Sequence, residues 1–120
     1  MPQPITVLIV EDEPLIRMDI AGELEDLGFI VLEAANAAEA ITVLATNAEI
    51  QILFTDVDMP GSMDGLALAA AVRNRWPPVK IIVTSGLRQV VEDDLPSNSR
   101  FFDKPYRAAD IAVAVREMVS

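Results

Sequence analysis

Short apolar runs alternate with longer stretches of helical spacing along the whole chain. Runs rich in Ile, Val, Leu and Phe predict five strands, at Ile5–Val10, Phe29–Glu33, Ile52–Thr55, Lys80–Thr84 and Phe101–Asp103. Within the first, third and fourth runs the apolar residues follow one another without alternating with polar ones. That pattern is typical of parallel strands covered by helices on both faces.

The segments between the predicted strands carry apolar residues at helical spacing, with start and stop signals at their ends. Pro14 occupies a favourable first helical position, and Gly28 ends the same helix. Asn36 is expected to cap the next helix, because its side chain can accept a hydrogen bond from the first turn. Pro77 ends the third helix, and Ala108–Val119 closes the chain as the last one.

Five strand–helix units in 120 residues predict an α/β fold, a doubly wound five-stranded parallel sheet with helices on both faces. The simplest strand order is the flavodoxin-like order 2-1-3-4-5. The unit between Thr84 and Lys104 is weaker than the others, because the acids at 92–94 stand near the carboxyl end of the predicted fourth helix and Pro96 follows them. We expect this fourth helix to be short or disordered.

Composition excludes several classes of protein. A chain of this length forms one domain, 1–120, and a hydrophobic fraction of 52% is ample for its core. No apolar stretch approaches the roughly 20 residues that span a bilayer, and the N-terminus does not resemble a signal peptide, so we expect a cytoplasmic protein without a membrane segment. A net charge of −10 with scattered Lys and Arg argues against direct nucleic-acid binding. The absence of Cys and His leaves only oxygen ligands for a metal, which favours Mg²⁺, Mn²⁺ or Ca²⁺.

Charged residues follow three of the predicted strands. Glu11 and Asp12 follow the first, Asp56 the third and Lys104 the fifth. In the order 2-1-3-4-5 the carboxyl ends of these strands meet at one edge, where open α/β sheets bind ligands. A single acid at a strand end is ordinarily just solvated, but clustered carboxylates repel by roughly 3 kcal/mol per pair at about 5 Å and an effective dielectric near 20. A divalent cation would offset this repulsion.

The same residues suggest phosphoryl chemistry. With neither Cys nor His in the chain, a covalent acceptor has to be a carboxylate, a hydroxyl or Lys. Asp56 is placed to attack a phosphoryl group in line, a reaction that needs positioning and charge neutralisation above all. Lys104 would supply positive charge to a phosphoryl oxygen, and the Thr84 hydroxyl would donate a hydrogen bond to another.

Four runs, in this order along the chain, carry a family resemblance: Val10-Glu11-Asp12-Glu13-Pro14, Thr55-Asp56-Val57-Asp58-Met59-Pro60-Gly61, Met63-Asp64-Gly65 and Lys104-Pro105. The chain resembles a response-regulator receiver domain of two-component signalling over essentially its whole length. The resemblance implies phosphorelay signal transduction, in which Asp56 accepts a phosphoryl group from a sensor histidine kinase or a histidine phosphotransfer protein. It implies a switched protein-interaction surface and no enzymatic activity beyond phosphorylation and dephosphorylation of the domain itself.

The resemblance also implies how metal and phosphate are held. Glu11 and Asp12 match the acidic pair that binds Mg²⁺ together with Asp56, with Mn²⁺ as the alternative ion. The backbone carbonyl of Asp58 matches a further metal ligand. Lys104 matches the phosphate-binding lysine.

A second set of residues matches the switch of these domains. In the family the phosphoryl group draws a Thr or Ser hydroxyl inward, and an aromatic residue, here Phe101, follows it. Thr84 and Ser85 are both candidates for that hydroxyl, and Thr84 is favoured because it directly ends the apolar strand. The peptide bond before Pro105 is expected to be cis. An Asp at position 58 is unusual beside the phosphoryl site, and we expect it to alter autodephosphorylation.

Two other functions fit parts of the pattern. The run Asp56-Val57-Asp58 after an apolar strand resembles the nucleophile motif of haloacid-dehalogenase-like phosphatases, although that family usually has Thr or Val where Pro60 stands. A phosphorylation-independent interaction module is the other alternative, against which the presence of Asp12, Asp56 and Lys104 argues. Because the chain begins with Met and ends just after the last predicted helix, we interpret it as a stand-alone receiver whose downstream protein target the sequence does not name.

Overall fold

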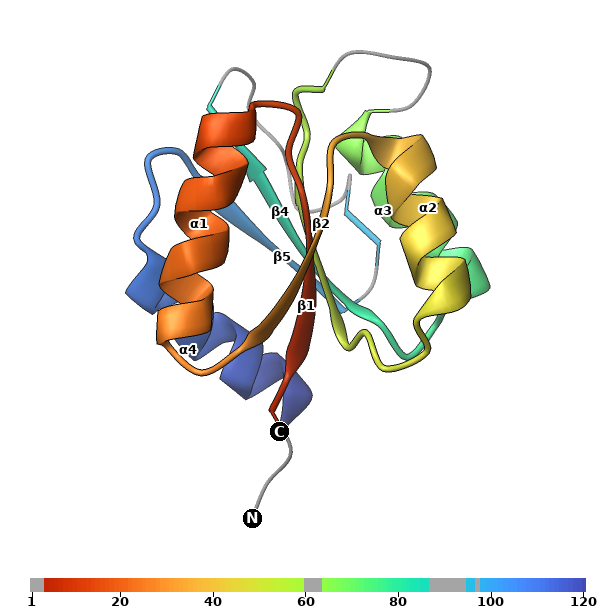
Figure 1. The fold of residues 1–120 in the computed structure, drawn as a ribbon. Coiled ribbons are helices and arrows are strands. Elements are labelled where there is room, and N and C mark those ends of the chain that lie inside the picture. Colours follow the sequence, from red (N-terminus) through yellow and green to blue (C-terminus); the bar gives the residue numbers. More distant parts are fainter. Residues whose placement is uncertain (1–3, 60–63, 87–94, 97) are drawn as a thin grey trace.

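The computed structural model of the protein describes residues 4–59, 64–86, 95–96 and 98–120. Five strands form one parallel sheet in the order β2-β1-β3-β4-β5, which confirms the predicted fold class. In chain order the elements are β1 (Thr6–Val10), α1 (Pro14–Asp26), β2 (Ile30–Ala34), α2 (Ala37–Thr46), β3 (Ile52–Asp56), α3 (Gly65–Arg75), β4 (Lys80–Ser85), β5 (Ser99–Asp103) and α4 (Ala108–Val119). Figure 1 shows α1 and α4 on one face of the sheet and α2 and α3 on the other.

The predicted fourth helix, between Thr84 and Lys104, falls mainly on residues 87–94, which lie outside the described residues. The helix α4 is the last helix of the chain, and its bounds, Ala108–Val119, are those predicted from the sequence. None of the helices in the described part of the chain is both long and apolar enough to span a membrane.

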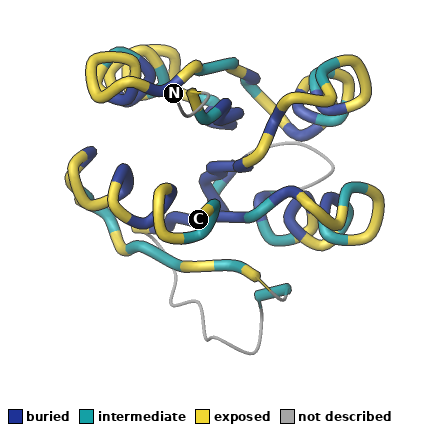
Figure 2. The backbone as a smooth tube through the Cα atoms, turned by 90° about the horizontal axis from the view of Figure 1, so that it is seen from below, coloured by how far each residue is buried: buried dark blue, intermediate teal, exposed yellow. Residues whose placement is uncertain are grey.

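Each face of the sheet has its own hydrophobic core. The core under α2 and α3 is formed by Leu8, Leu53, Ile81, Leu44 and Leu68, among others. The core under α1 and α4 is formed by Ile9, Phe54, Ile82, Leu24 and Ile111, among others. Side chains of consecutive residues in a central strand thus pack into the two cores in turn. This explains why β1 and β3 are apolar almost throughout and wholly buried. β2 and β5 lie at the sheet edges and are partly exposed (Figure 2).

The helix ends lie close to where the sequence signals predict them. α1 begins at Pro14 and ends before Gly28, whose φ of 99° is a conformation that glycine adopts readily. The Asn36 side chain accepts a hydrogen bond of 2.9 Å from the Glu39 N–H and so caps α2. Asp64 caps α3 in the same way. These local signals need no tertiary information, because each acts within one helical turn.

Two strands extend further than predicted, into the polar residues at their carboxyl ends. β3 ends at Asp56 rather than Thr55, and β4 ends at Ser85 rather than Thr84. The parallel pairing continues there, with Asp56 opposite Thr84 and Ser85 opposite Asp103. The sheet therefore fixes the backbone of the residues that end these strands.

Candidate functional site

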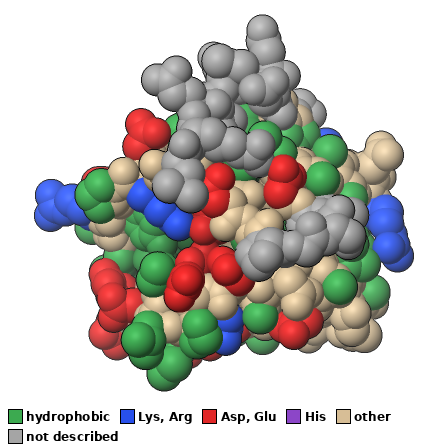
Figure 3. Space-filling view, turned by 90° about the horizontal axis from the view of Figure 1, so that it is seen from above, with side chains coloured by type: hydrophobic (Ala, Val, Ile, Leu, Met, Phe, Trp, Pro, Cys, Tyr) green, Lys and Arg blue, Asp and Glu red, His purple; other side chains and the backbone are tan. Residues whose placement is uncertain are grey.

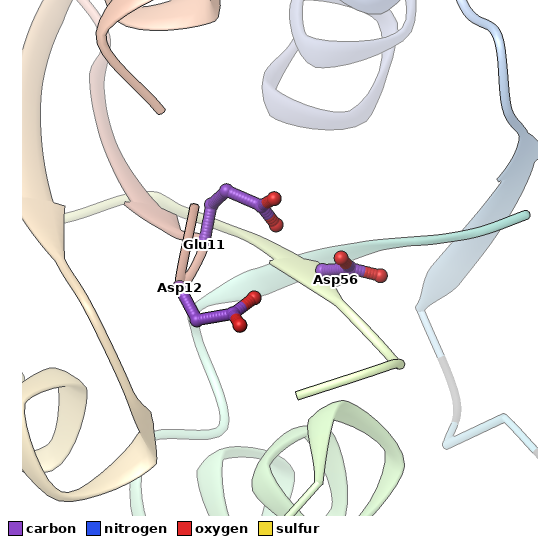
Figure 4. A group of neighbouring side chains, drawn as sticks. All are labelled: Glu11, Asp12 and Asp56. Carbon is purple, nitrogen blue, oxygen red and sulfur yellow. The ribbon is translucent and has the colours of Figure 1, made fainter. Parts of the chain in front are cut away.

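Three carboxyl groups come together at the carboxyl edge of the sheet. Glu11 and Asp12 follow β1, and Asp56 ends β3, which is the neighbouring strand. One oxygen from each of the three groups lies within 4.8 Å of the other two. Figure 4 shows the Glu11 and Asp12 carboxyl groups extending toward Asp56, and Figure 3 shows acidic side chains gathered on this end of the molecule. The strand order thus brings Glu11, Asp12 and Asp56 together, as predicted from the sequence.

A lysine from the fifth strand's end completes the cluster. Lys104 Nζ lies 2.7 Å from Asp56 Oδ2, in an ion pair that joins residues 48 positions apart. The other oxygen, Asp56 Oδ1, accepts a hydrogen bond of 3.1 Å from the Asp58 backbone N–H. Asp56 is almost fully buried, with 4% of its surface exposed. Its carboxylate is therefore held from both sides in one orientation.

Burial and crowding shift the protonation of two groups at the site. Burial raises the pKa of Glu11 to about 8, and the hydrogen bond and negative charge of Asp56 act in the same direction. Burial alone would lower the pKa of Lys104, but the hydrogen bond and charge of Asp56 and the charges of Glu11 and Asp58 together outweigh it, so the pKa of Lys104 is raised above its ordinary value. At neutral pH without a metal, Glu11 thus holds its proton while Asp56 and Lys104 form the ion pair.

The donor set fits a hard divalent cation. Three carboxyl groups within reach of one ion, and neither His nor Cys in the chain, match the all-oxygen coordination that Mg²⁺ requires. Burial is the main cause of the raised pKa of Glu11; the hydrogen bond and charge of Asp56 and the charge of Asp12 add to it, and the charge of Lys104 opposes it. A cavity of about 290 Å³ opens beside these groups and is lined by Glu11, Asp12, Glu13, Ile16, Asp56, Asp58, Gly86 and Lys104. It can admit a phosphoryl group next to Asp56.

Thr84 and Ser85, the two candidate switch hydroxyls, differ in their surroundings. The Ser85 hydroxyl donates a hydrogen bond of 2.7 Å to Asp58 Oδ2. Because side chains alternate along β4, Ser85 follows Val83 on the face of α2 and α3, where Phe101 also packs. Thr84 is buried and follows Ile82 on the opposite face. Although the sequence favours Thr84, the geometry supports Ser85 as the hydroxyl that shares a face with Phe101.

The segment after β5 adds an aromatic group to the site. The Lys104–Pro105 peptide bond is cis, the conformation that the resemblance implies. Tyr106 follows, and its ring meets that of Phe54 edge to face at 5.4 Å between centroids. Burial and the nearby carboxylates of Glu11 and Asp56 raise the pKa of Tyr106 to about 12, so that its hydroxyl is neutral in the physiological range. Tyr106 was not predicted as a site residue, because a single aromatic residue after a proline does not indicate any chemistry.

Arg17 is a second residue that sequence reasoning missed. Its guanidinium group donates a hydrogen bond of 2.8 Å to the backbone carbonyl of Glu11 and contacts the Glu33 carboxylate of β2 at 3.2 Å. It therefore ties the loop that carries the acidic pair to the neighbouring strand. In the sequence Arg17 is only one of several charged residues on the predicted first helix, and nothing local indicates its contacts.

The sequence matches the response regulator receiver domain family over residues 7–116, and the chain belongs to this family of two-component signalling domains. It is similar to the sensor kinase CckA of Brucella abortus, with 36% identity over 118 residues that cover 95% of this chain and 12% of the kinase. The chain spans less than two thirds of the length of the curated relatives it matches.

Solved structures agree with this assignment. A response regulator receiver protein from Sinorhizobium medicae superposes with a TM-score of 0.87 at 28% identity, covering 98% of this chain and 95% of that one. The response regulator TrrA of Thermotoga maritima, solved in complex with Mg²⁺-BeF, superposes with a TM-score of 0.82 at 26% identity, covering 95% of this chain and 98% of that one. Both are similar to this chain across nearly the whole domain.

Proposed function

We propose that Asp56 accepts a phosphoryl group from a phosphorylated histidine of a sensor histidine kinase or a histidine phosphotransfer protein, and that this switches a protein-interaction surface. The observation that carries the proposal is the Asp56 carboxylate itself. It is buried at the floor of a cavity, paired with Lys104 at 2.7 Å, and surrounded by two further carboxyl groups. Phosphoryl transfer needs a fixed nucleophile and positive charge beside the phosphoryl oxygens, which Lys104 and a cation held by the carboxyl groups would supply.

The transfer is a substitution at phosphorus. An Asp56 carboxylate oxygen forms the new O–P bond as the N–P bond of the donor histidine breaks, and the imidazole leaves with that electron pair. The Asp58 N–H keeps the second Asp56 oxygen in place, and Lys104 is positioned to neutralise charge on the transferred group. Glu11, Asp12, Asp56 and the backbone carbonyl of Asp58 would hold Mg²⁺, or Mn²⁺, which supplies the remaining positive charge.

A protein donor has apolar surface to contact beside the site. Leu15 and Met18 of α1 expose 81% and 63% of their surface. A second cavity, of about 480 Å³, lies between α1 and the segment after β5 and is lined by Ile16, Asp19, Ile20, Glu23, Gly86, Lys104, Pro105, Tyr106 and Ala108. Such a surface next to Asp56 favours a protein as the phosphodonor. A cytoplasmic location and a single domain over 1–120 remain predictions from the sequence.

The test is an intact-mass measurement after incubation with Mg²⁺ and acetyl phosphate. The parent should gain the mass of one phosphoryl group, and the gain should disappear in Asp56→Asn and in the presence of a chelator. Asp110→Asn makes the same chemical change at an exposed position of α4 and should phosphorylate normally. An unchanged gain in Asp56→Asn would refute the proposal. Rapid multiple-turnover hydrolysis of simple phosphate esters would instead favour the haloacid-dehalogenase-like phosphatase.

A further inference from the structure

The acidic side chain of Asp58 links the phosphoacceptor to β4. Its backbone N–H donates to Asp56 Oδ1 at 3.1 Å, and its Oδ2 accepts the Ser85 hydroxyl at 2.7 Å. The second contact joins residues 27 positions apart, on the loop after β3 and at the end of β4. One residue therefore contacts both the group that takes the phosphoryl and the hydroxyl beside it.

The Ser85 hydroxyl has one proton to donate. In this structure the Ser85 hydroxyl donates to the Asp58 carboxylate, and hydrogen bonds to ionised acceptors are stronger than those to neutral ones. A phosphoryl group on Asp56 would be a second anionic acceptor close by. Ser85 cannot donate fully to both, so any bond to the phosphoryl group has to replace the bond to Asp58.

We propose that Asp58 is a positioning residue that holds the Ser85 hydroxyl in the unphosphorylated protein and competes with the phosphoryl group for its proton. This inference rests on the proposed function of Asp56. This competition weakens the binding of a phosphoryl group at Asp56. It also keeps Ser85 and Phe101 in the conformation of the unphosphorylated protein until a phosphoryl group is present. Ser85 and Phe101 lie on the same face of the sheet. The hydrogen bond that fixes Ser85 therefore also affects the conformation available to Phe101.

A double-mutant cycle tests the competition, with beryllofluoride as the phosphoryl mimic. Its affinity in the presence of Mg²⁺ is measured by calorimetry for the parent, Asp58→Ala, Ser85→Ala and the double variant. Asp58→Ala should tighten binding about tenfold, the size of one hydrogen bond to a charged group. In the Ser85→Ala background the same change should tighten binding clearly less than in the parent, because there only the loss of a nearby negative charge remains.

Two controls separate this role from a general effect of charge or folding. Thr84→Val removes the neighbouring hydroxyl on the opposite face of β4 and should show no coupling with Asp58→Ala. Without beryllofluoride, Asp58→Ala should change the affinity for Mg²⁺ equally in the parent and in Ser85→Ala. If Asp58→Ala does not fold, Asp58→Asn replaces it in the cycle, with a smaller effect expected in the same direction.

The outcomes distinguish this inference from the proposed function. Equal effects of the Asp58 change in both Ser85 backgrounds, or coupling to Thr84 instead, would overturn the competition while leaving Asp56 as the acceptor. Failure of the parent to bind beryllofluoride at all would overturn the proposed function and the inference with it.

Discussion

Glu11 lies beside Asp56 with 5% of its surface exposed, and its pKa is raised to about 8, mainly by burial. A metal that binds its carboxylate has to displace the proton. We therefore expect Mg²⁺ affinity to rise with pH up to about 8, with close to one proton released per ion bound below that pH. Titration calorimetry in buffers of different ionisation enthalpy measures this release. In Glu11→Gln the affinity should be weaker and nearly independent of pH in this range; an unchanged pH dependence would contradict the role of Glu11.

The same shift affects the stability of the metal-free protein. The pKa of Glu11 in the folded state lies above its ordinary value of 4.5, so the folded state binds more protons than the unfolded state between pH 4.5 and about 8. The contribution of Glu11 to stability is thus fully present below pH 4.5 and is lost as the pH rises through about 8. Mg²⁺ should oppose this loss, because it binds the ionised form of the folded protein.

Asp12 adds negative charge to a cluster that Lys104 only partly compensates. We expect Asp12→Asn to raise the free energy of unfolding of the metal-free protein by about 1–2 kcal/mol, through the loss of repulsion with Asp56. Denaturant melts with and without Mg²⁺ measure this, and Mg²⁺ should stabilise the variant less than the parent. The matched change Asp110→Asn, in the first turn of α4, should not stabilise. If metal-free Asp12→Asn melts below the parent, the view of an electrostatically strained site is wrong.

The packing of α3 against the end of β3 depends on a glycine. A Cβ atom at Gly65 would overlap the Asp56 carbonyl and crowd the backbone of Val57. Gly65→Ala should therefore lower the free energy of unfolding by about 2–4 kcal/mol and slow phosphorylation, because relief requires moving the strand end that carries Asp56.

Gly22 in α1 provides the control, since nothing lies within 4 Å of a Cβ there. Gly22→Ala should be neutral or should stabilise by up to about 1 kcal/mol, as expected for replacing glycine in a helix. Thermal melts and the acetyl phosphate assay compare the two variants. Equal effects of both substitutions would show that the contact of Gly65 with β3 is not important.

The central strands and most helix ends could be predicted because their signals are local. Uninterrupted apolar runs mark β1, β3 and β4, and Pro14 and Asn36 act within a single helical turn. The ends of β3 and β4 could not, since pairing with a neighbouring strand extends them into polar residues. The contact of Gly65 with β3 also joins two elements, and no pattern within either of them indicates it.

The meeting of Asp12, Asp56 and Lys104 follows from the strand order, and the sequence was sufficient to predict it. The hydrogen bond between Ser85 and Asp58 was not predictable, because it joins the end of β4 to the loop after β3. Sequence reasoning thus located the acidic site, whereas the contacts that orient its groups required the assembled structure.

The central claim is that Asp56 itself carries the phosphoryl group, and one measurement tests it most directly. The protein is treated with acetyl phosphate and Mg²⁺, reduced with borohydride, digested and mapped by tandem mass spectrometry. Borohydride reduces an aspartyl phosphate to homoserine, so homoserine should appear at position 56 and be absent when acetyl phosphate is omitted. Homoserine at another acid, or unmodified Asp56 in protein that has gained phosphoryl mass, would contradict the account.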